Sequence, residues 1–128
     1  MRDHTSLKAW QCARAVAFGV LRLGRSHWKP WAATHFDQAL RASLSVQLNI
    51  AEGYAFGDGP TFVRHLRIAY GSAVETGDIL VLLRDAEVAD IETLASLIDA
   101  NVEGKACLLG LLRRRNGWRP AQAGTHRS

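Results

Sequence analysis

Residues 35–56 read HFDQALRASLSVQLNIAEGYAF, and this stretch decides the fold. It contains no proline, and its apolar residues recur every three or four positions instead of alternating, which is typical of an amphipathic α-helix. The apolar residues cover more than half of the helix circumference: Phe36, Ala39, Leu40, Ala42, Leu44, Val46, Leu48, Ile50, Ala51 and Tyr54. An outer helix of a monomeric bundle needs a narrower apolar arc. We therefore expect this helix to be buried on two sides, one of them in a homo-oligomer.

Breaks in the sequence divide the rest of the chain into further helical segments. The breaks are Gly24 to Thr34, which contains Pro30, then Gly57-Asp58-Gly59-Pro60, and Asp90, whose residue type often caps helix N-termini. We expect four helices, at about 6–24, 35–56, 61–86 and 90–113. Their short connections favour antiparallel neighbours. The predicted fold is all-α: an antiparallel up-down four-helix bundle in residues 1–113, followed by a basic, flexible C-terminal tail in residues 114–128.

Composition excludes several classes of protein. The chain has 128 residues, of which 48% are hydrophobic and 22% charged, as in one folded domain. No apolar run approaches the roughly 18 residues of a membrane span. Cys12 and Cys107 form no pair with metal-ligand spacing, and the five histidines are scattered. We therefore expect a cytoplasmic protein with no membrane partner, no metal and no other cofactor.

Charge is segregated along the chain. Residues 1–35 hold six basic residues and one acidic residue, residues 36–112 hold five and eleven, and residues 113–128 hold five and none. On the first predicted helix the core face is Trp10, Ala13, Val16, Ala17, Val20 and Leu21, and the other side gathers Lys8, Arg14, Arg22 and Arg25. On the last, the expected core face is Ile91, Leu94, Ile98, Val102, Leu109 and Leu112, beside the acids Glu92, Asp99 and Glu103. The first helix is basic and the last is acidic.

Two blocks of sequence resemble a known family. They are Arg41-Ala42-Ser43-Leu44-Ser45-Val46 with Asn49-Ile50-Ala51-Glu52-Gly53-Tyr54, and Phe62, Leu66, Ile68-Ala69, Gly71-Ser72 and Glu75. Together they are similar to the four-helix-bundle proteins encoded in intervening sequences of bacterial large-subunit ribosomal RNA. The resemblance covers roughly residues 6–113. The same fold group includes the accessory variability determinant of diversity-generating retroelements, which implies a basic homopentameric ring that binds nucleic acid and partners a reverse transcriptase.

The clustered basic residues are the candidate nucleic-acid-binding site: Lys8, Arg14, Arg22, Arg25, Lys29, Arg113, Arg114 and Arg115. Lysine and arginine neutralise phosphates, and Trp28 and Trp31 could stack on exposed bases. Two other interpretations remain open at this point. The basic residues could be a solvated surface, with the tryptophans covering a bundle end, or the first helix could dock on the acidic last helix of a neighbouring subunit in a head-to-tail contact.

A second group of polar residues invites an active-site interpretation: Arg41, Ser45, Asn49, Glu52 and Glu75. Carboxylates beside an arginine can transfer protons. Their spacing on facing helices favours a structural polar network instead, in which the groups satisfy one another and set the register. We predict no catalytic residue and no enzyme.

These observations predict a non-catalytic, homo-oligomeric bundle, pentameric by resemblance. We expect it to act as a nucleic-acid-binding accessory for RNA or DNA, with a reverse transcriptase as a further candidate partner. The alternative is a structural or protein-interaction bundle of the ribosomal-insertion branch, with no nucleic-acid role.

Overall fold

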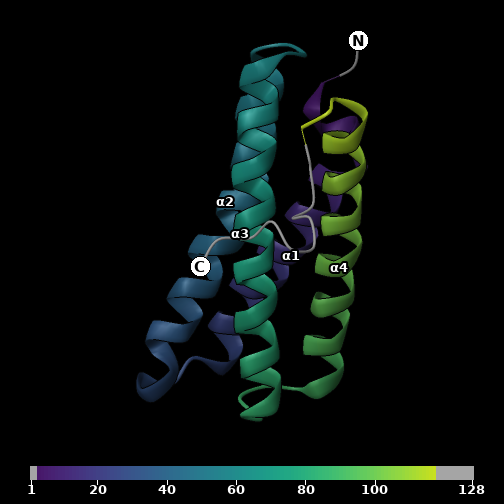
Figure 1. Cartoon of the computed structure of the whole chain (residues 1–128). Coiled ribbons are helices and arrows are strands. Elements are labelled where there is room, and N and C mark those ends of the chain that lie inside the picture. The colour runs from purple at the N-terminus through teal and green to yellow at the C-terminus, as the bar shows by residue number, and fades with distance from the viewer. Residues whose placement is uncertain (1–2, 118–128) are drawn as a thin grey trace, which may run out of the picture.

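The computed structural model describes residues 3–117, which form four long helices and two single 3-10 turns. The elements are η1 (His4–Ser6), α1 (Lys8–His27), η2 (Pro30–Ala32), α2 (Ala33–Ala55), α3 (Pro60–Asp85) and α4 (Ile91–Arg114). Successive long helices run in opposite directions (Figure 1). α1 packs against α2 and α4, and α3 packs against the same two helices, so the four axes form a square in the order α1, α2, α3, α4. The predicted all-α antiparallel four-helix bundle is confirmed.

Local chemistry accounts for the helix ends. Asp90 caps α4 because its Oδ2 accepts hydrogen bonds from the backbone N–H (3.0 Å) and the hydroxyl (2.9 Å) of Thr93. These bonds, the backbone one foremost, lower the pKa of the Asp90 carboxyl. Pro60 opens α3, where a missing N–H costs nothing. α1 continues through Gly24 to His27, beyond the predicted end near residue 24, and stops before Lys29, which precedes Pro30 and is extended.

The C-terminal end of α4 is packed further than the sequence suggested. The predicted tail begins at residue 114, yet the carbonyl oxygen of Gly117 accepts a hydrogen bond from Arg67 Nε of α3 (2.8 Å). The Gly117 backbone N–H in turn donates to the Leu112 carbonyl oxygen (2.7 Å). Residues 118–128, which make up most of the predicted tail, lie outside the described residues. Within residues 3–117, no helix combines the length and the apolar character needed to cross a bilayer.

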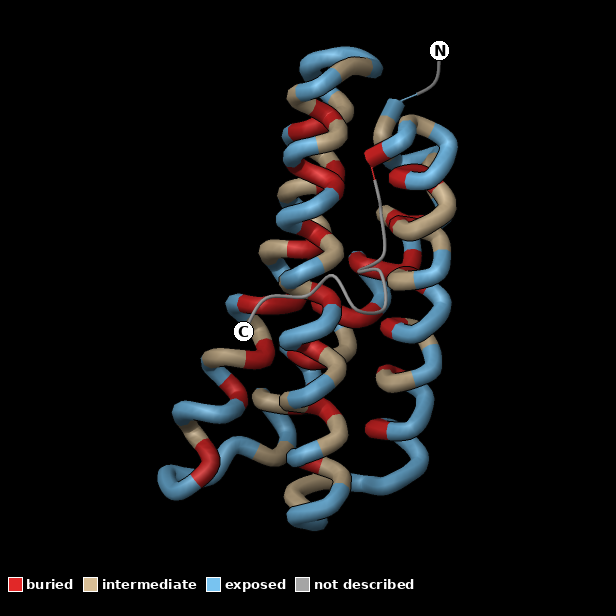
Figure 2. Tube along the Cα trace, in the orientation of Figure 1, coloured by how far each residue is buried: buried red, intermediate tan, exposed pale blue. Residues whose placement is uncertain are grey.

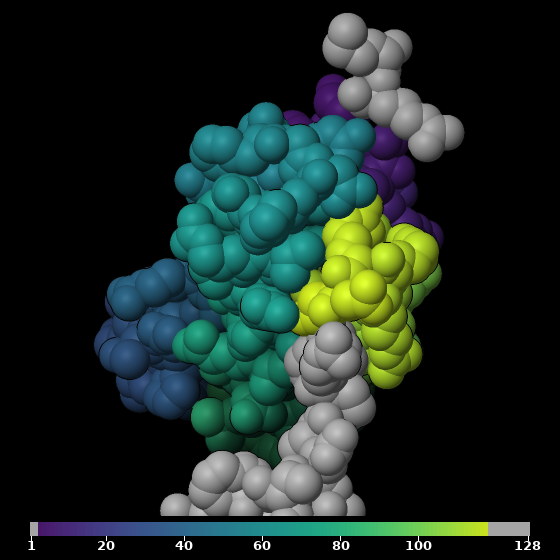
Figure 3. All heavy atoms as spheres, turned by 45° about the horizontal axis from the view of Figure 1, so that its top comes forward, coloured from purple at the N-terminus to yellow at the C-terminus, as the bar shows by residue number. Residues whose placement is uncertain are grey.

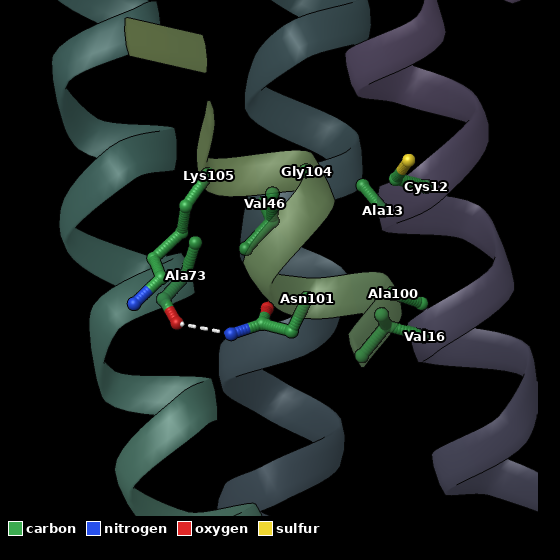
Figure 4. Close-up of a pocket in the computed structure, with 9 residues that line it drawn as sticks. All are labelled: Cys12, Ala13, Val16, Val46, Ala73, Ala100, Asn101, Gly104 and Lys105. Carbon is green, nitrogen blue, oxygen red and sulfur yellow. Dashed lines mark hydrogen bonds between the residues drawn. The ribbon is translucent and has the colours of Figure 1, made fainter. Parts of the chain in front are cut away.

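The core consists of two clusters of buried residues, one in each half of the bundle. One cluster centres on Ile50, Phe62 and Leu66, and the other on Phe36, Leu80 and Leu94. Between them, small residues such as Ala13, Ala73 and Gly104 surround a cavity of about 10 Å³ (Figure 4). Beside this cavity, Asn101 Nδ2 donates a hydrogen bond to the Ala73 carbonyl oxygen (2.9 Å). A buried polar contact therefore joins α3 and α4 near the middle of both helices. Figure 2 shows the buried stripe of each helix turned toward the other three.

The predicted core face of α4 is wrong for two of its six residues, and two more, Ile98 and Leu109, are only half-buried. Leu94 and Leu112 are buried, but Ile91 is 65% exposed and Val102 is 54% exposed. The face that is actually buried holds Leu94, Leu97, Asn101, Gly104, Leu108, Leu111 and Leu112. Asn101 and Gly104 carry no apolar side chain, so an apolar pattern cannot place them inside. Asn101 is buried because its side chain bonds to α3. Gly104 is buried because α1 approaches α4 closely there: a Cβ added at Gly104 would lie 3.2 Å from the Cβ of Cys12.

α1 and α2 also keep apolar residues outside the core. Leu21, predicted to be buried, is 55% exposed. On α2 the buried residues are Phe36, Ala39, Ala42, Ser43, Val46, Ile50 and Gly53, whereas Leu44 and Leu48 are 37% and 55% exposed. The bundle therefore covers one side of the wide apolar arc of α2, and the other side faces outward.

Gly53 sets how closely α2 approaches α3. A Cβ added at Gly53 would lie 2.6 Å from His65 Cβ and 3.1 Å from Phe62 Cδ1, both on α3. These distances are below ordinary contact, and the Cβ of His65 is held near its own backbone. Only glycine permits this approach without moving one helix away from the other.

We expect Gly53→Ala to lower the free energy of unfolding by about 1–3 kcal/mol, because the added methyl overpacks the α2–α3 contact. Gly71→Ala is the matched control, since Gly71 lies within α3 and a Cβ there has no neighbour within 4 Å. Alanine should raise stability at Gly71 by about 0.5–1 kcal/mol through its higher helix propensity. Urea denaturation followed by circular dichroism measures both changes, and equal effects at the two sites would contradict the role given to Gly53.

Candidate nucleic-acid interface

Two arginines on α1 flank one exposed aromatic ring. The guanidinium carbons of Arg14 and Arg22 lie 5.2 Å and 5.8 Å from the centroid of the Phe18 ring, within cation–π range. All three side chains are exposed, and Phe18 is 47% accessible. Their spacing of four residues places them on one line along the helix. The contact with Phe18 holds two positive charges in a defined position on the outer surface of α1.

Further basic residues lie where α1 ends and η2 begins, among two exposed tryptophans. Arg25 and Lys29 are exposed, and within residues 3–117 neither forms an ion pair or a side-chain hydrogen bond. Trp28 is 51% exposed and Trp31 is 68% exposed. We call Arg25, Trp28, Lys29 and Trp31 the α1–η2 end. The core next to this end contains Ala32 and Phe36, which are 1% and 3% exposed.

The remaining predicted residues lie at the opposite end of the bundle. Lys8 and Lys29 are separated by the length of α1, roughly 30 Å. Lys8 Nζ lies 3.4 Å from Glu103 Oε2, and this carboxylate raises the pKa of the lysine by hydrogen bonding and by its charge. Arg113 and Arg114 are exposed in the last turn of α4. The eight predicted residues are therefore spread over the whole length of the bundle, with Arg14 and Arg22 between the two ends.

Arg115 differs from its two neighbours because its guanidinium is already occupied. Nε lies 2.7 Å from Asp58 Oδ1, Nη2 donates to Asp58 Oδ2 (3.2 Å), and Nη1 donates to the Leu111 carbonyl oxygen (2.9 Å). The group also covers the Phe62 ring at 5.0 Å. Asp58 belongs to the α2–α3 connection, so Arg115 fastens the end of α4 to the start of α3. Figure 3 shows the yellow end of α4 lying against the teal residues of this region.

The predicted polar group lies partly at the contact between α2 and α3. Ser45 Oγ and Ser72 Oγ are 2.7 Å apart, Asn49 Nδ2 donates to the Ser45 carbonyl oxygen (2.9 Å), and Asn49 Oδ1 lies 2.9 Å from Nδ1 of the buried His65. Since the Asn49 oxygen must accept, the His65 ring carries its proton on Nδ1 in this arrangement. Glu75 accepts from Gln38 Nε2. Arg41 and Glu52 are exposed and lie outside these contacts.

This arrangement favours the structural interpretation of the polar group. Every bond in it joins α2 to α3 or runs along α2, which sets the register of the two helices. Three of its members, Gln38, His65 and Ser72, were missed by sequence reasoning. Their positions four and seven residues from other polar residues on a shared helix face were the available signal.

The described residues were also searched for a reactive cysteine and for a group of side chains that could bind a metal ion. Burial raises the pKa of the Cys12 thiol, which disfavours the reactive thiolate. Among residues 3–117, no three His, Cys, Asp or Glu side chains are grouped so that they could hold a metal ion.

The fold and the surface define a class: an up-down four-helix bundle with one basic outer helix and a polar α2–α3 contact. The chain belongs to the 23S rRNA-intervening sequence protein family, whose sequence model matches residues 5–110. A solved structure of the same fold is a protein of unknown function from the S23 ribosomal protein family of Bacteroides thetaiotaomicron VPI-5482. It is 23% identical, with a TM-score of 0.59, and the match covers 80% of this chain and 98% of that one. No curated protein matches this chain.

We expect Arg115→Ala to lower the free energy of unfolding by about 1–3 kcal/mol, because it removes a bidentate carboxylate contact and the cover over Phe62. Arg114→Ala, which removes the same charge from an exposed position one residue earlier, should change stability by less than about 0.5 kcal/mol. Chemical denaturation distinguishes the two. A loss for Arg114→Ala as large as for Arg115→Ala would show that net charge, and not the Asp58 contact, determines the effect.

Proposed function

We propose that the protein is a non-catalytic, homo-oligomeric bundle that binds nucleic acid at its α1–η2 end. The observation that carries this proposal is the presence of two cations, Arg25 and Lys29, that have no ion pair with any residue in 3–117, beside two exposed tryptophans. Proteins that bind single strands combine cations that follow the phosphates with aromatic rings on which bases stack. The α1–η2 end supplies both kinds of group within a few residues.

The α3–α4 connection at the same end of the bundle restricts where a nucleic acid would lie. It carries the exposed acids Glu87 and Asp90 and follows the exposed Asp85 at the end of α3, and these carboxylates repel phosphates. A strand would therefore approach from the α1 and η2 side. Along that side the exposed Arg22 extends the positive surface by one further turn of α1.

The family supplies the first nucleic acid to test. It is named for intervening sequences of 23S rRNA, so bacterial ribosomal RNA carrying such an insertion is the natural probe. The likeness to the retroelement accessory determinant adds a reverse transcriptase as a candidate protein partner and five as a candidate number of subunits. In either setting the protein would act as an accessory that holds RNA.

A second candidate function is a protein-interaction bundle with no nucleic-acid role. It is favoured by the contacts of Lys8 with Glu103 and of Arg14 and Arg22 with Phe18, which engage three of the eight predicted basic residues. In that case the basic side of α1 serves subunit contacts alone. The two functions differ in whether Arg25, Lys29 and Trp31 bind nucleic acid.

We expect the double variant Arg25→Ala/Lys29→Ala to weaken binding to single-stranded RNA from an rRNA insertion. Losing two phosphate contacts should reduce the slope of log K against log salt by about 1.4, since each contact on a single strand contributes about 0.7. Trp31→Ala should weaken binding at least about fivefold through lost stacking, with little change in the salt slope. Fluorescence anisotropy over a range of salt concentrations measures both quantities.

The control removes two positive charges elsewhere. Arg41→Ala/Arg64→Ala removes exposed charges from α2 and α3, outside the α1–η2 end, and should leave the salt slope nearly unchanged. If both double variants lose the same affinity, binding depends on net charge and not on this site. Absence of measurable binding by the wild-type protein at low salt would favour the interaction bundle.

The opposite end of the bundle is tested separately with Arg113→Ala/Arg114→Ala, which leaves the Arg115–Asp58 contact in place. If these two arginines hold phosphates as their position in the basic segment predicts, affinity should fall to a similar extent for RNAs of different sequence. An unchanged affinity would confine the site to the α1–η2 end.

A further inference from the structure

An open hollow on the outer side of α1 adjoins the α1–η2 end. It has a volume of about 550 Å³ and is lined by Phe18, Leu21, Arg22, Arg25 and Ser26. This volume is within the range of roughly 300–1,000 Å³ that is usual for sites of small organic molecules. Arg25 also belongs to the α1–η2 end, so the two surfaces are continuous. We call these five residues the Phe18 hollow.

The apolar part of the Phe18 hollow is open to solvent. Phe18 is 47% exposed and Leu21 is 55% exposed, although both lie well inside a long helix. A neighbouring groove shares these two residues and extends the apolar surface toward Leu40 and Leu44 of α2. Contiguous apolar surface of this kind on a small domain marks a place where another molecule packs.

The charged residues of the hollow are both basic. α1 contains no Asp or Glu, and within residues 3–117 neither Arg22 nor Arg25 forms an ion pair or a side-chain hydrogen bond. On α2, the exposed Asp37 lies one turn before Leu40 of the neighbouring groove. A phosphate would therefore bind over α1 and away from α2, because cations attract it and the Asp37 carboxylate repels it.

This combination of groups suits one chemical class, an unpaired nucleotide. A base can pack against Phe18, Leu21 and the planar Arg22 guanidinium, since bases stack on aromatic rings and on guanidinium planes. Its phosphate can pair with Arg22 or Arg25. The Ser26 hydroxyl donates to the Arg22 carbonyl oxygen (3.1 Å), which leaves its own oxygen to accept from a base amino group or a ribose hydroxyl. In a duplex the faces of the bases are covered by stacking, so the ligand must be single-stranded.

We propose that the Phe18 hollow is a second nucleotide subsite, which holds an unpaired base of the same strand that binds at the α1–η2 end. This inference rests on the nucleic-acid part of the proposed function and adds the path and the minimum length of the strand. Phe18 precedes Trp28 by ten residues, which corresponds to about 15 Å along α1. A strand must cover this distance to use both sites, and single-strand-binding domains cover roughly 4–16 nucleotides.

The positions of the other charged residues determine how far the strand continues along α1. Beyond the hollow, the exposed Arg14 lies 5.2 Å from the Phe18 ring and extends the positive surface by one turn. The next basic residue toward the start of α1 is Lys8, whose Nζ lies 3.4 Å from Glu103 Oε2. This carboxylate repels a phosphate, so the path of the strand ends near Arg14.

The test measures affinity for a series of single-stranded RNAs from an rRNA insertion, from about three to about twelve nucleotides long. Wild-type affinity should rise with length and gain at least about fivefold where the strand reaches Phe18. Phe18→Ala should match the wild type on short strands and lack this further gain, because only the distant subsite is lost. Trp31→Ala should weaken binding at every length. Fluorescence anisotropy measures all of these affinities.

Phe56→Ala is the matched control. Phe56 is 65% exposed and follows the C-terminal end of α2, at the opposite end of that helix from η2. This variant loses the same ring and should keep the wild-type dependence on length. For long strands, Arg22→Ala should lower the slope of log K against log salt by about 0.7, and Lys8→Ala should leave it unchanged. Circular dichroism of every variant verifies that a loss of binding is not a loss of folding.

Other outcomes would overturn the subsite. If Phe18→Ala follows the wild type at every length, the hollow binds no base, and continued weakening by Trp31→Ala leaves the proposed function standing. An equal loss at all lengths places the effect of Phe18 at the α1–η2 end or in the fold, and also refutes the subsite. If no strand binds the wild-type protein at low salt, the nucleic-acid function itself fails and the subsite fails with it.

Discussion

The close approach of α2 and α3 is the constraint on which the rest of the bundle depends. Gly53 lets the two backbones come together where any side chain would meet His65 and Phe62. Because the helices are this close, the hydroxyl and amide groups of Ser45, Asn49, Ser72 and His65 reach one another and set the register. A shift by one turn would leave these polar groups unpaired in a half-buried contact, which is costly. The family block Asn49-Ile50-Ala51-Glu52-Gly53 thus supplies both the small residue and the polar partner.

The packing of the helices also determines which basic side chains are exposed and which are held by contacts within the bundle. α1 buries one side, which includes Val16, Val20 and Leu23, and its opposite side faces away from the core. Its arginines are consequently exposed, and Phe18 orders two of them instead of entering the core. Arg115, in contrast, is held in place, because its guanidinium pairs with Asp58 and lies over the Phe62 ring. Within the run of three arginines, Arg115 therefore contributes to stability, whereas Arg113 and Arg114 are exposed and accessible to a partner.

Sequence reasoning succeeded where the signal was local. The four helices follow from proline and glycine breaks and from the period of the apolar residues, and their ends differ from the predicted ones by a few residues. It failed on the orientation of α4, since a buried asparagine and a buried glycine interrupt the apolar pattern on which the prediction relied. The predicted nucleic-acid-binding set includes Lys8 and Arg113 as well as Lys29, which lies about one length of α1 away, and binding at these residues remains a prediction. For the polar group, it found Ser45, Asn49 and Glu75 but included Arg41 and Glu52, which lie outside the α2–α3 contacts.

The sequence by itself determined the class of the protein: the number and order of the helices, their antiparallel arrangement, the family, and the separation of basic from acidic segments. These properties depend on backbone hydrogen bonds and turn residues that act within a few positions, so a linear pattern records them. Only the tertiary structure decided which side of each helix is buried and that Arg115 pairs with Asp58. Each of these depends on contacts between residues far apart in the chain, and a helix can turn about its axis to satisfy them without any change in its local pattern.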